Sequence, residues 1–309
     1  MNDPGDWTVA EVNARAALAA HASTRQLAAA RFTPIDVSLA NFAWRAEIAT
    51  ERNFVRLARG GTEALGADLQ AEARILHLVS AAGLAPPVLR CDPSQRLLVT
   101  RWIEPITPVA QATDDSVVES VAQALARLHR LAVPEGLRPI RFQAQASLLR
   151  SALPATGRAS DLDAIAARVF AQLDHDRAAP SLCHHDVHAQ NMVVDAQRRL
   201  WLVDWEYAGL NDPVFDLASF ASQGGLPADA THRLCAAYAR SGGEINEGRL
   251  ELARWAFDFV QWLWYRGLRS SAIGGHGSEE ASLRSDRIER SLLERASAVL
   301  RCNNRSFVQ

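Results

Sequence analysis

The sequence predicts an α+β protein with two lobes, and three observations carry this prediction. Short segments with alternating or apolar patterns, which are typical of strands, are concentrated in the first third of the chain. Amphipathic patterns with helical spacing dominate from residue 114 onward. The chain has 309 residues, which exceeds one average domain and leaves room for two lobes. We therefore expect a small N-terminal lobe over residues 1–103 and a larger, mostly helical C-terminal lobe over residues 104–309.

Local patterns order the N-terminal lobe as a helical segment, three strands, one helix and a hairpin. Gly83 followed by Pro86-Pro87 ends the helix. The turn Asp92-Pro93-Ser94 separates the two strands of the hairpin. The expected ranges are residues 7–30 for the helical segment, 32–47 for the first two strands, 53–58 for the third strand, 68–82 for the helix, and 88–91 and 97–102 for the hairpin.

The C-terminal lobe is predicted as a series of helices. Residues 114–131 begin with two acidic residues, which the helix dipole favours. Residues 246–269 form the most aromatic segment of the chain, and Trp255, Phe259 and Trp262 fall on one helical face. Two further helices are expected, over residues 227–240 and 279–300.

The composition excludes several classes of protein. The net charge of −2 gives no reason to expect nucleic acid or an anionic membrane as a partner. The four cysteines form no C-x-x-C pair, which argues against disulfide and zinc frameworks. No apolar run reaches the roughly 20 residues that span a bilayer, and the N-terminal MNDPGDW is unlike a signal peptide. We expect a cytoplasmic protein without a nucleic-acid partner or membrane insertion.

Residues 181–220 carry the chemistry of the chain. His184, Asp186 and Asn191 follow an H-x-D-x-x-x-x-N pattern, which has the spacing of a kinase catalytic loop. Two short apolar runs around a polar turn come next, so residues 192–203 are predicted to form a hairpin. This hairpin folds Asp204 back beside Asn191, where a carboxylate and an amide can share one Mg²⁺.

This stretch resembles the choline/ethanolamine kinase branch of the aminoglycoside-phosphotransferase superfamily. The loop HHDVHAQN is similar to the catalytic loop of the superfamily, and LVDWEYAGLNDPVFDLA is similar to a D-[FW]-E-Y-x-G-x-N-x-x-x-x-D-L-A run of choline kinases and their bacterial relatives. The resemblance implies a protein-kinase-like fold, with an antiparallel sheet and one helix in the small lobe. It also implies a kinase that uses ATP and Mg²⁺ to phosphorylate a small alcohol.

The resemblance assigns roles to the residues of this stretch. Asp186 is expected to act as the general base, and His184 to orient the loop. Asn191 and Asp204 are expected to hold Mg²⁺, and Glu206 to complete the surroundings of the metal or brace the loop. Two further residues receive supporting roles: Asp216 anchors the catalytic loop through backbone amides, and His129 packs beneath it.

The nucleotide site implied by the resemblance lies in the N-terminal lobe. Arg56 on the third strand is expected to clamp phosphate, with Arg59 as its rival and Glu72 as its ion-pair partner. The family has a glycine-rich loop over the phosphates, whereas this chain has SLANFAW without glycine. Further contacts are expected from Ser38 and Asn41 in that loop, and from the backbone of Trp102 and Ile103 against adenine.

The acceptor site is predicted from the aromatic helix. Trp255, Trp262, Tyr265 and Asp258 would form a cage with a carboxylate for a quaternary ammonium group, and His188 is also expected to contact the substrate. An ordinary buried helix is the alternative interpretation of the tryptophans.

Other functions remain open at this stage. Thiamine or an aminoglycoside is an alternative acceptor, and a pseudokinase-like binding module is an alternative from another class. Cys183, His184, His185 and His188 would be the ligands of an alternative zinc site, although no second ligand pair is visible.

Overall fold

The computed structural model describes residues 4–35, 41–60, 68–105, 114–133, 135–137, 139–153, 157–270 and 278–302. The chain packs as two compact units. The first comprises Met1–Ala110, Pro134–Gly136 and Ala189–Ala208, and the second comprises Gln111–Val133, Leu137–His188 and Gly209–Gln309. The division into lobes at residue 103 stays a prediction.

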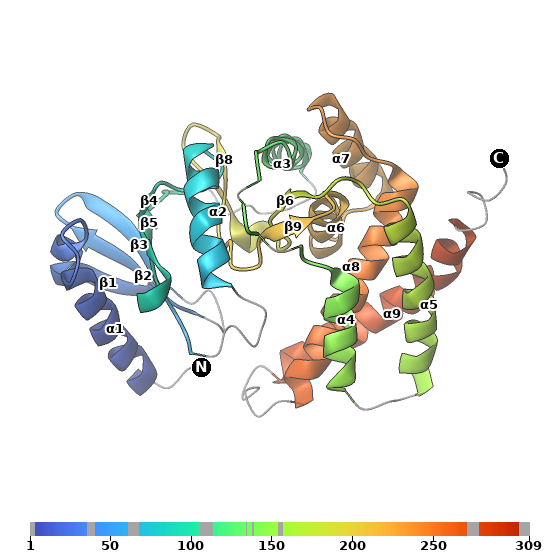
Figure 1. Ribbon diagram of the computed structural model, residues 1–309, viewed down its shortest axis with the longest axis horizontal. Coiled ribbons are helices and arrows are strands. Elements are labelled where there is room, and N and C mark those ends of the chain that lie inside the picture. Colours follow the sequence, from blue (N-terminus) through green and yellow to red (C-terminus); the bar gives the residue numbers. More distant parts are fainter. Residues whose placement is uncertain are drawn as a thin grey trace. The chain divides into compact units, whose positions relative to one another are not determined.

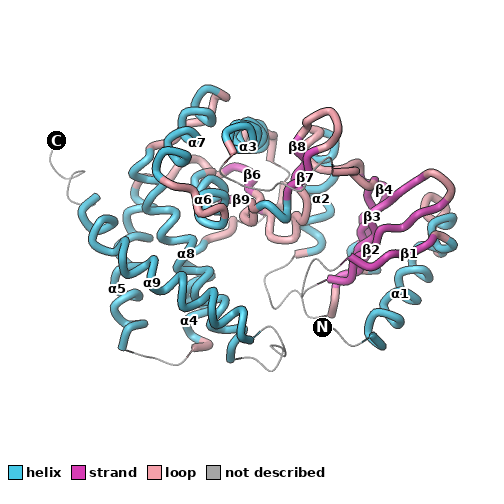
Figure 2. Tube along the Cα trace, turned by 180° about the vertical axis from the view of Figure 1, so that it is seen from behind, coloured by secondary structure: helices cyan, strands magenta, loops and turns pink. Residues whose placement is uncertain are grey.

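The first unit is built on a five-stranded antiparallel sheet in the order β1-β2-β3-β5-β4. Helices α1 and α2 lie on opposite sides of the sheet (Figures 1 and 2). The elements are α1 (Pro4–Ala19), the short 3-10 helix η1 (Arg25–Ala29), β1 (Arg31–Ile35), β2 (Asn41–Ile48), β3 (Glu51–Ala58), α2 (Leu69–Ala81), β4 (Val88–Asp92), the turn η3 (Pro93–Gln95) and β5 (Leu97–Arg101).

The alternation of side chains along β3 decides which residues face each helix. Val55 is fully buried in the apolar core that the sheet shares with α1, where Leu18 and Trp44 also pack. The neighbouring Arg56 points to the other face, because successive side chains of a strand alternate, and it meets Glu72 of α2 there. Asp68 caps α2 by accepting from the backbone amides of residues 70 and 71.

A two-stranded hairpin completes the first unit. It follows the one-turn helix η4 (Ala189–Asn191) and pairs β7 (Met192–Val194) with β8 (Leu200–Leu202). Asp195 builds the turn, since its carboxylate accepts from the amides of Gln197 and Arg199 and from the indole of Trp201. The predicted hairpin over residues 192–203 is therefore confirmed.

The second unit is mostly helical, with α8 at its centre. Helix α8 packs against α9, α6, α4 and α5, and α3 packs against α7; Figure 2 shows these helices as cyan tubes. The elements are α3 (Asp115–Leu128), α4 (Phe142–Ser151), α5 (Gly157–His175), β6 (Ser181–Cys183), β9 (Gly209–Asn211), α6 (Val214–Gln223), α7 (Ala228–Arg240), α8 (Glu247–Ser270) and α9 (Ser278–Cys302). No helix among the described residues is both long and apolar enough to cross a membrane.

The sequence did not predict the pairing of β6 with β9. Both strands have only three residues, and unlike β7 and β8 they are not joined by a short turn, so no local pattern marks their pairing. The pairing joins Ser181 to Asn211 and Cys183 to Gly209. It therefore brings the start of the catalytic stretch beside the end of the DWEYAG segment.

The backbone at Gly243 passes close to the ring of Tyr238. A Cβ on Gly243 would lie 2.2 Å from the ring of Tyr238, which is buried. We expect Gly243→Ala to lower the free energy of unfolding by about 1–3 kcal/mol, because the ring must move within a packed core. Thermal and denaturant unfolding measure this change.

Gly267→Ala is the matched control for this prediction. Gly267 lies in α8, and among the described residues no atom beyond its chain neighbours and the nearby backbone of its own helix lies within 4 Å of the position that a methyl group added there would take. The substitution should leave stability unchanged or raise it by up to about 1 kcal/mol through helix propensity. Equal effects of the two substitutions would contradict the packing argument.

Candidate active site

The loop that carries Asp186 is held by one carboxylate. Asp216, fully buried near the start of α6, accepts from the backbone amides of His184 (2.8 Å) and His185 (2.7 Å). His185 has a positive φ of 68°, which is part of the backbone conformation that turns both amides toward this carboxylate. The expectation that Asp216 anchors the loop through backbone amides is confirmed.

His129 supports this anchor from α3. Its Nε2 lies 3.0 Å from Asp216 Oδ2, and its Nδ1 lies 2.7 Å from the hydroxyl of Tyr238. Burial alone would raise the pKa of Asp216, but the hydrogen bond and charge of His129, with the loop amides, lower it to about 2. The expected place of His129 beneath the loop is confirmed, and Asp216 is ionised at neutral pH.

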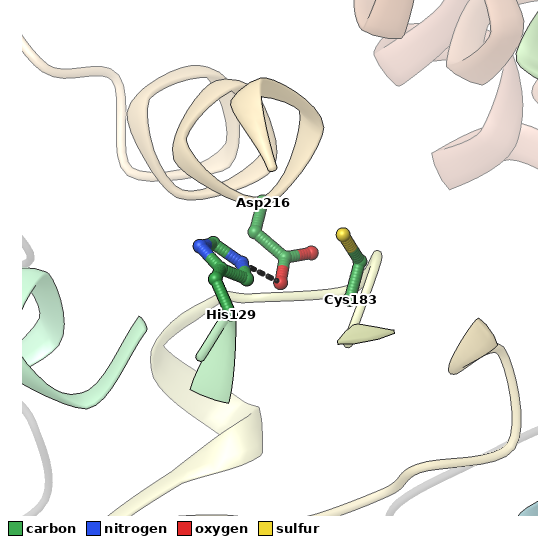
Figure 3. Close-up of side chains that lie close together, drawn as sticks. All are labelled: His129, Cys183 and Asp216. Carbon is green, nitrogen blue, oxygen red and sulfur yellow. Dashed lines mark hydrogen bonds and ion pairs between the residues drawn. The ribbon is translucent and has the colours of Figure 1, made fainter. Parts of the chain in front are cut away.

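Cys183 completes a buried group that resembles a metal site. Figure 3 shows it with His129 and Asp216, and the ligand atoms of the three residues lie within 4.8 Å of one another. Burial raises the pKa of the Cys183 thiol well above its ordinary value, so the thiolate that zinc requires is disfavoured. Asp216 is committed to the loop amides and to His129. We interpret the group as the anchor of the loop. The zinc alternative had named a different set of residues, and within the described chain the ligand atoms of that set do not converge.

Asp186 itself is partly buried, and both of its carboxylate oxygens have partners. Gln223 Nε2 donates to Oδ1 at 2.9 Å, and His188 Nε2 lies 3.3 Å from Oδ2. Burial opposes the charge, but the hydrogen bond and charge of His188 and the amide of Gln223 lower the pKa of Asp186 overall. Asp186 is therefore a carboxylate at neutral pH, as a general base must be.

His184 has a structural position in the same loop. Its side chain is fully buried, and its Nδ1 lies 3.3 Å from the backbone nitrogen of Asp186 and accepts from it. This contact fixes the peptide that carries Asp186. The geometry supports an orienting role for His184.

The expected metal ligands lie together in the first unit. The backbone nitrogen of Val203 donates to the carbonyl of Asn191 at 3.0 Å, which extends the β7–β8 ladder by one bond. Asp204 follows directly with a positive φ of 62°, a conformation that aspartate adopts more readily than most residues. The hairpin therefore brings the acid and the amide to the same end of one short ladder.

Arg56 joins two carboxylates of this unit. Its Nη2 donates to Glu72 at 2.5 Å, and its Nη1 donates to Asp204 at 3.1 Å. Burial would lower the pKa of Arg56, but the charges of Glu72 and Asp204 raise it, so the guanidinium stays charged. The predicted Arg56–Glu72 ion pair is confirmed. The rival residue, Arg59, instead stacks its guanidinium on the ring of Phe42 at 3.7 Å.

Glu206 and Asn41 form a second contact between the hairpin segment and the sheet. Asn41 Nδ2 donates to Glu206 Oε2 at 3.0 Å, and both side chains are buried. Burial and the neighbouring charge of Asp204 raise the pKa of Glu206 to about 7. Asn41 Oδ1 and Glu72 Oε1 are buried acceptors to which no described residue donates.

The oxygen atoms of these side chains fit a hydrated Mg²⁺ as ligands. Asp204, Asn191 and Glu206 offer the hard oxygen ligands that this ion prefers. The two unpaired acceptors, on Asn41 and Glu72, would gain donors from water held by the ion. Of the other expected nucleotide contacts, Trp102 and Ile103 lie in the extended segment after β5, and Ser38 lies outside the described residues.

The aromatic helix is packed against α9. Trp255 and Trp262 are fully buried, and their indoles donate to the carbonyl of Leu292 and to Glu289. Their rings are covered, which matches the alternative of an ordinary buried helix. Two other residues expected in the cage contact arginines of α9: Asp258 accepts from Arg295, and the Tyr265 hydroxyl lies 3.0 Å from Arg284.

Sequence reasoning missed two polar residues of the loop anchor. Ser219 Oγ accepts from the backbone nitrogen of Val187 at 3.0 Å, and Gln223 holds Asp186. Both lie on the face of α6 that carries Asp216, at i, i+3 and i+7. The signal was present as a D-x-x-S-x-x-x-Q spacing, but only the structure shows that this face meets the loop.

The fold and this loop define a phosphotransferase that acts on an alcohol group. The model of the phosphotransferase enzyme family matches residues 11–255, so the chain belongs to that family.

Among curated proteins, the chain is similar to Protein LicA of Haemophilus influenzae, with 29% identity over 192 residues, 58% of this chain and 70% of LicA. Among solved structures, a choline/ethanolamine kinase family protein from Mesorhizobium loti matches with a TM-score of 0.75 and 24% identity, over 94% of this chain and 98% of that one. The choline kinase LicA from Streptococcus pneumoniae matches with a TM-score of 0.65 and 19% identity, over 80% and 90%. These structural likenesses establish the kinase-like fold.

The anchor makes a prediction about stability and pH. Because the folded-state pKa of Asp216 lies below its ordinary value of about 4, its ionisation stabilises the fold above that pH. This contribution is lost as the pH falls through the folded-state pKa. We expect Asp216→Asn to lower the free energy of unfolding by about 2–3 kcal/mol at pH 7.

Denaturant unfolding between pH 3 and pH 7 measures this contribution, with the exposed Asp229 changed to Asn as the control. The cost of Asp216→Asn should shrink toward the acid end of this range. A cost that is independent of pH would show that the charge of Asp216 does not stabilise the loop.

Proposed function

We propose that this protein transfers the γ-phosphate of ATP, with Mg²⁺, to the hydroxyl of choline, ethanolamine or a similar amino alcohol. The observation that carries the proposal is the position of Asp186 on a loop whose backbone amides at residues 184, 185 and 187 are held by α6. The partners of its carboxylate also lower the pKa of Asp186. The similarity to LicA and to a choline/ethanolamine kinase family protein supports the class of acceptor.

Asp186 would act as the general base. As the acceptor oxygen bonds to the γ-phosphorus, its proton passes to the Asp186 carboxylate, and the bond between this phosphorus and the oxygen bridging to the β-phosphorus breaks to release ADP. Because the loop amides and α6 already hold this residue, little reorganisation accompanies the transfer. The lowered pKa keeps the base unprotonated and available.

Residues of the first unit would bind the nucleotide. Asn191 and Asp204, with Glu206 nearby, would hold Mg²⁺, which neutralises phosphate charge when it is bound. Arg56 carries a permanent charge and several donors, so it would contact phosphate while Glu72 keeps it in place. A solved LicA structure in complex with AMP supports nucleotide binding by this fold.

The contacts to the acceptor are proposed from the residues that keep exposed surface. His188 and Tyr265 remain partly exposed, and Asp258 is partly exposed beside its arginine partner. Trp255 and Trp262 are fully buried, so they would support these residues through packing rather than contact the acceptor directly. An amino alcohol is small enough to need few contacts, which distinguishes it from an aminoglycoside.

The proposal predicts transfer that depends on Asp186 and on Mg²⁺. With ATP and Mg²⁺, we expect a coupled assay to detect ADP formation with choline or ethanolamine, and EDTA to abolish it. Asp186→Asn should lower kcat about 10²–10⁴-fold, as loss of a general base does, while ATP binding persists. Asp204→Asn should weaken Mg²⁺-dependent nucleotide binding itself.

Asp229→Asn is the control, because it makes the same chemical change elsewhere. Asp229 is exposed on α7, where it pairs with Arg233, so kcat should stay unchanged. Thiamine and aminoglycosides complete the acceptor panel. Turnover with one of these and not with amino alcohols would reassign the acceptor. ATP binding without transfer to any acceptor would identify a binding module instead.

A further inference from the structure

Three polar side chains on one face of helix α6 contact successive parts of the catalytic loop. Most of the helix is apolar and buried, but Asp216, Ser219 and Gln223 share one face at i, i+3 and i+7. Asp216 holds the amides of residues 184 and 185, and Ser219 holds the amide of Val187. Gln223 reaches a side chain of the loop, the carboxylate of Asp186.

The amide of Gln223 is itself oriented by the helix. Its Nε2 lies 2.9 Å from Asp186 Oδ1 and 3.2 Å from Ser219 Oγ, so its two N–H groups can serve both acceptors. Ser219 Oγ also accepts from the backbone nitrogen of Val187, the residue after Asp186. These contacts close a ring that runs from Asp186 through Val187, Ser219 and Gln223 back to Asp186.

The two oxygens of Asp186 have chemically different partners. His188 places an imidazole ring nitrogen at Oδ2, whereas Gln223 places a neutral amide, which has no proton to exchange, at Oδ1. The Gln223 contact therefore sets orientation without exchanging protons. Each carboxylate oxygen can accept a further hydrogen bond, so this contact leaves the base able to receive a proton.

We propose that Gln223 is a positioning residue for phosphoryl transfer: its amide, steadied by Ser219, fixes the plane of the Asp186 carboxylate relative to the acceptor hydroxyl. This inference rests on the proposed role of Asp186 as the base. A base must lie within hydrogen-bond reach of the proton that it takes, so a carboxylate that rotates freely spends less time in the productive geometry.

The kinetic test compares one substitution at two glutamines. Gln223→Met removes the donor and nearly keeps the length of the side chain. We expect it to lower kcat about tenfold, the effect of one hydrogen bond of about 1.4 kcal/mol, with little change in KM for ATP or the acceptor. Gln123→Met is the control, because Gln123 is exposed like Gln223 and also donates to a carboxylate, that of Glu119 on α3.

A double-mutant cycle separates positioning from general support of the loop. If Gln223 acts through the Asp186 carboxylate, adding Gln223→Met to Asp186→Asn should leave the residual rate unchanged. Multiplicative losses would overturn the proposal. So would a Gln223→Met variant that matches the Gln123→Met control, or one whose whole loss lies in KM for the acceptor.

A measurement without turnover separates this proposal from the proposed function. In ¹⁵N NMR spectra of the nucleotide-free protein, the side-chain amide of Gln223 should shift when Asp186 is changed to Asn, whereas that of Gln123 should not. An unshifted Gln223 amide would overturn the positioning contact even if the enzyme phosphorylates amino alcohols. A shifted amide in a protein that transfers phosphate to no acceptor would support the contact and reject the proposed function.

Discussion

The buried carboxylate of Asp216 is the interaction on which the catalytic loop depends. A buried charge is costly unless it is fully hydrogen-bonded, and here two consecutive backbone amides and His129 satisfy it. The same bonds fix the loop immediately before Asp186. The pairing of β6 with β9 brings together the strand that precedes this loop and the strand that precedes α6. The geometry of Asp186, the base that we propose, is therefore determined by the folded chain, before any ligand binds.

In the first unit, one cationic side chain likewise binds more than one partner. A single guanidinium, Arg56, holds both Glu72 and Asp204. A planar fork with five donors can serve two carboxylates in fixed directions, which the compact ammonium of lysine does less well. This geometry gives a physical reason for arginine on the third strand of this chain. It also links the helix α2 to the residue that we propose as a metal ligand, without help from a glycine-rich loop.

Local spacing predicted much of this structure, and long-range packing accounts for what it missed. The strands around Arg56, the capped helix that carries Glu72 and the hairpin before Asp204 are each encoded within a few residues, so the sequence could indicate them. The pairing of β6 with β9 and the contact of Gln223 with Asp186 depend on segments about 30 residues apart. The aromatic helix shows the same limit, because its spacing predicts a shared face but not that α9 covers Trp255 and Trp262.

Because Trp255 and Trp262 are buried, we expect residues near Asp186 to determine which acceptor binds. Family membership and the anchored carboxylate support transfer to an alcohol, and the proposed acceptor is a small amino alcohol. The most direct test is ³¹P NMR of the protein with ATP, Mg²⁺ and choline or ethanolamine. The account predicts a new phosphomonoester resonance that grows in step with ADP. Formation of inorganic phosphate alone, or no loss of the γ-phosphate signal, would contradict it.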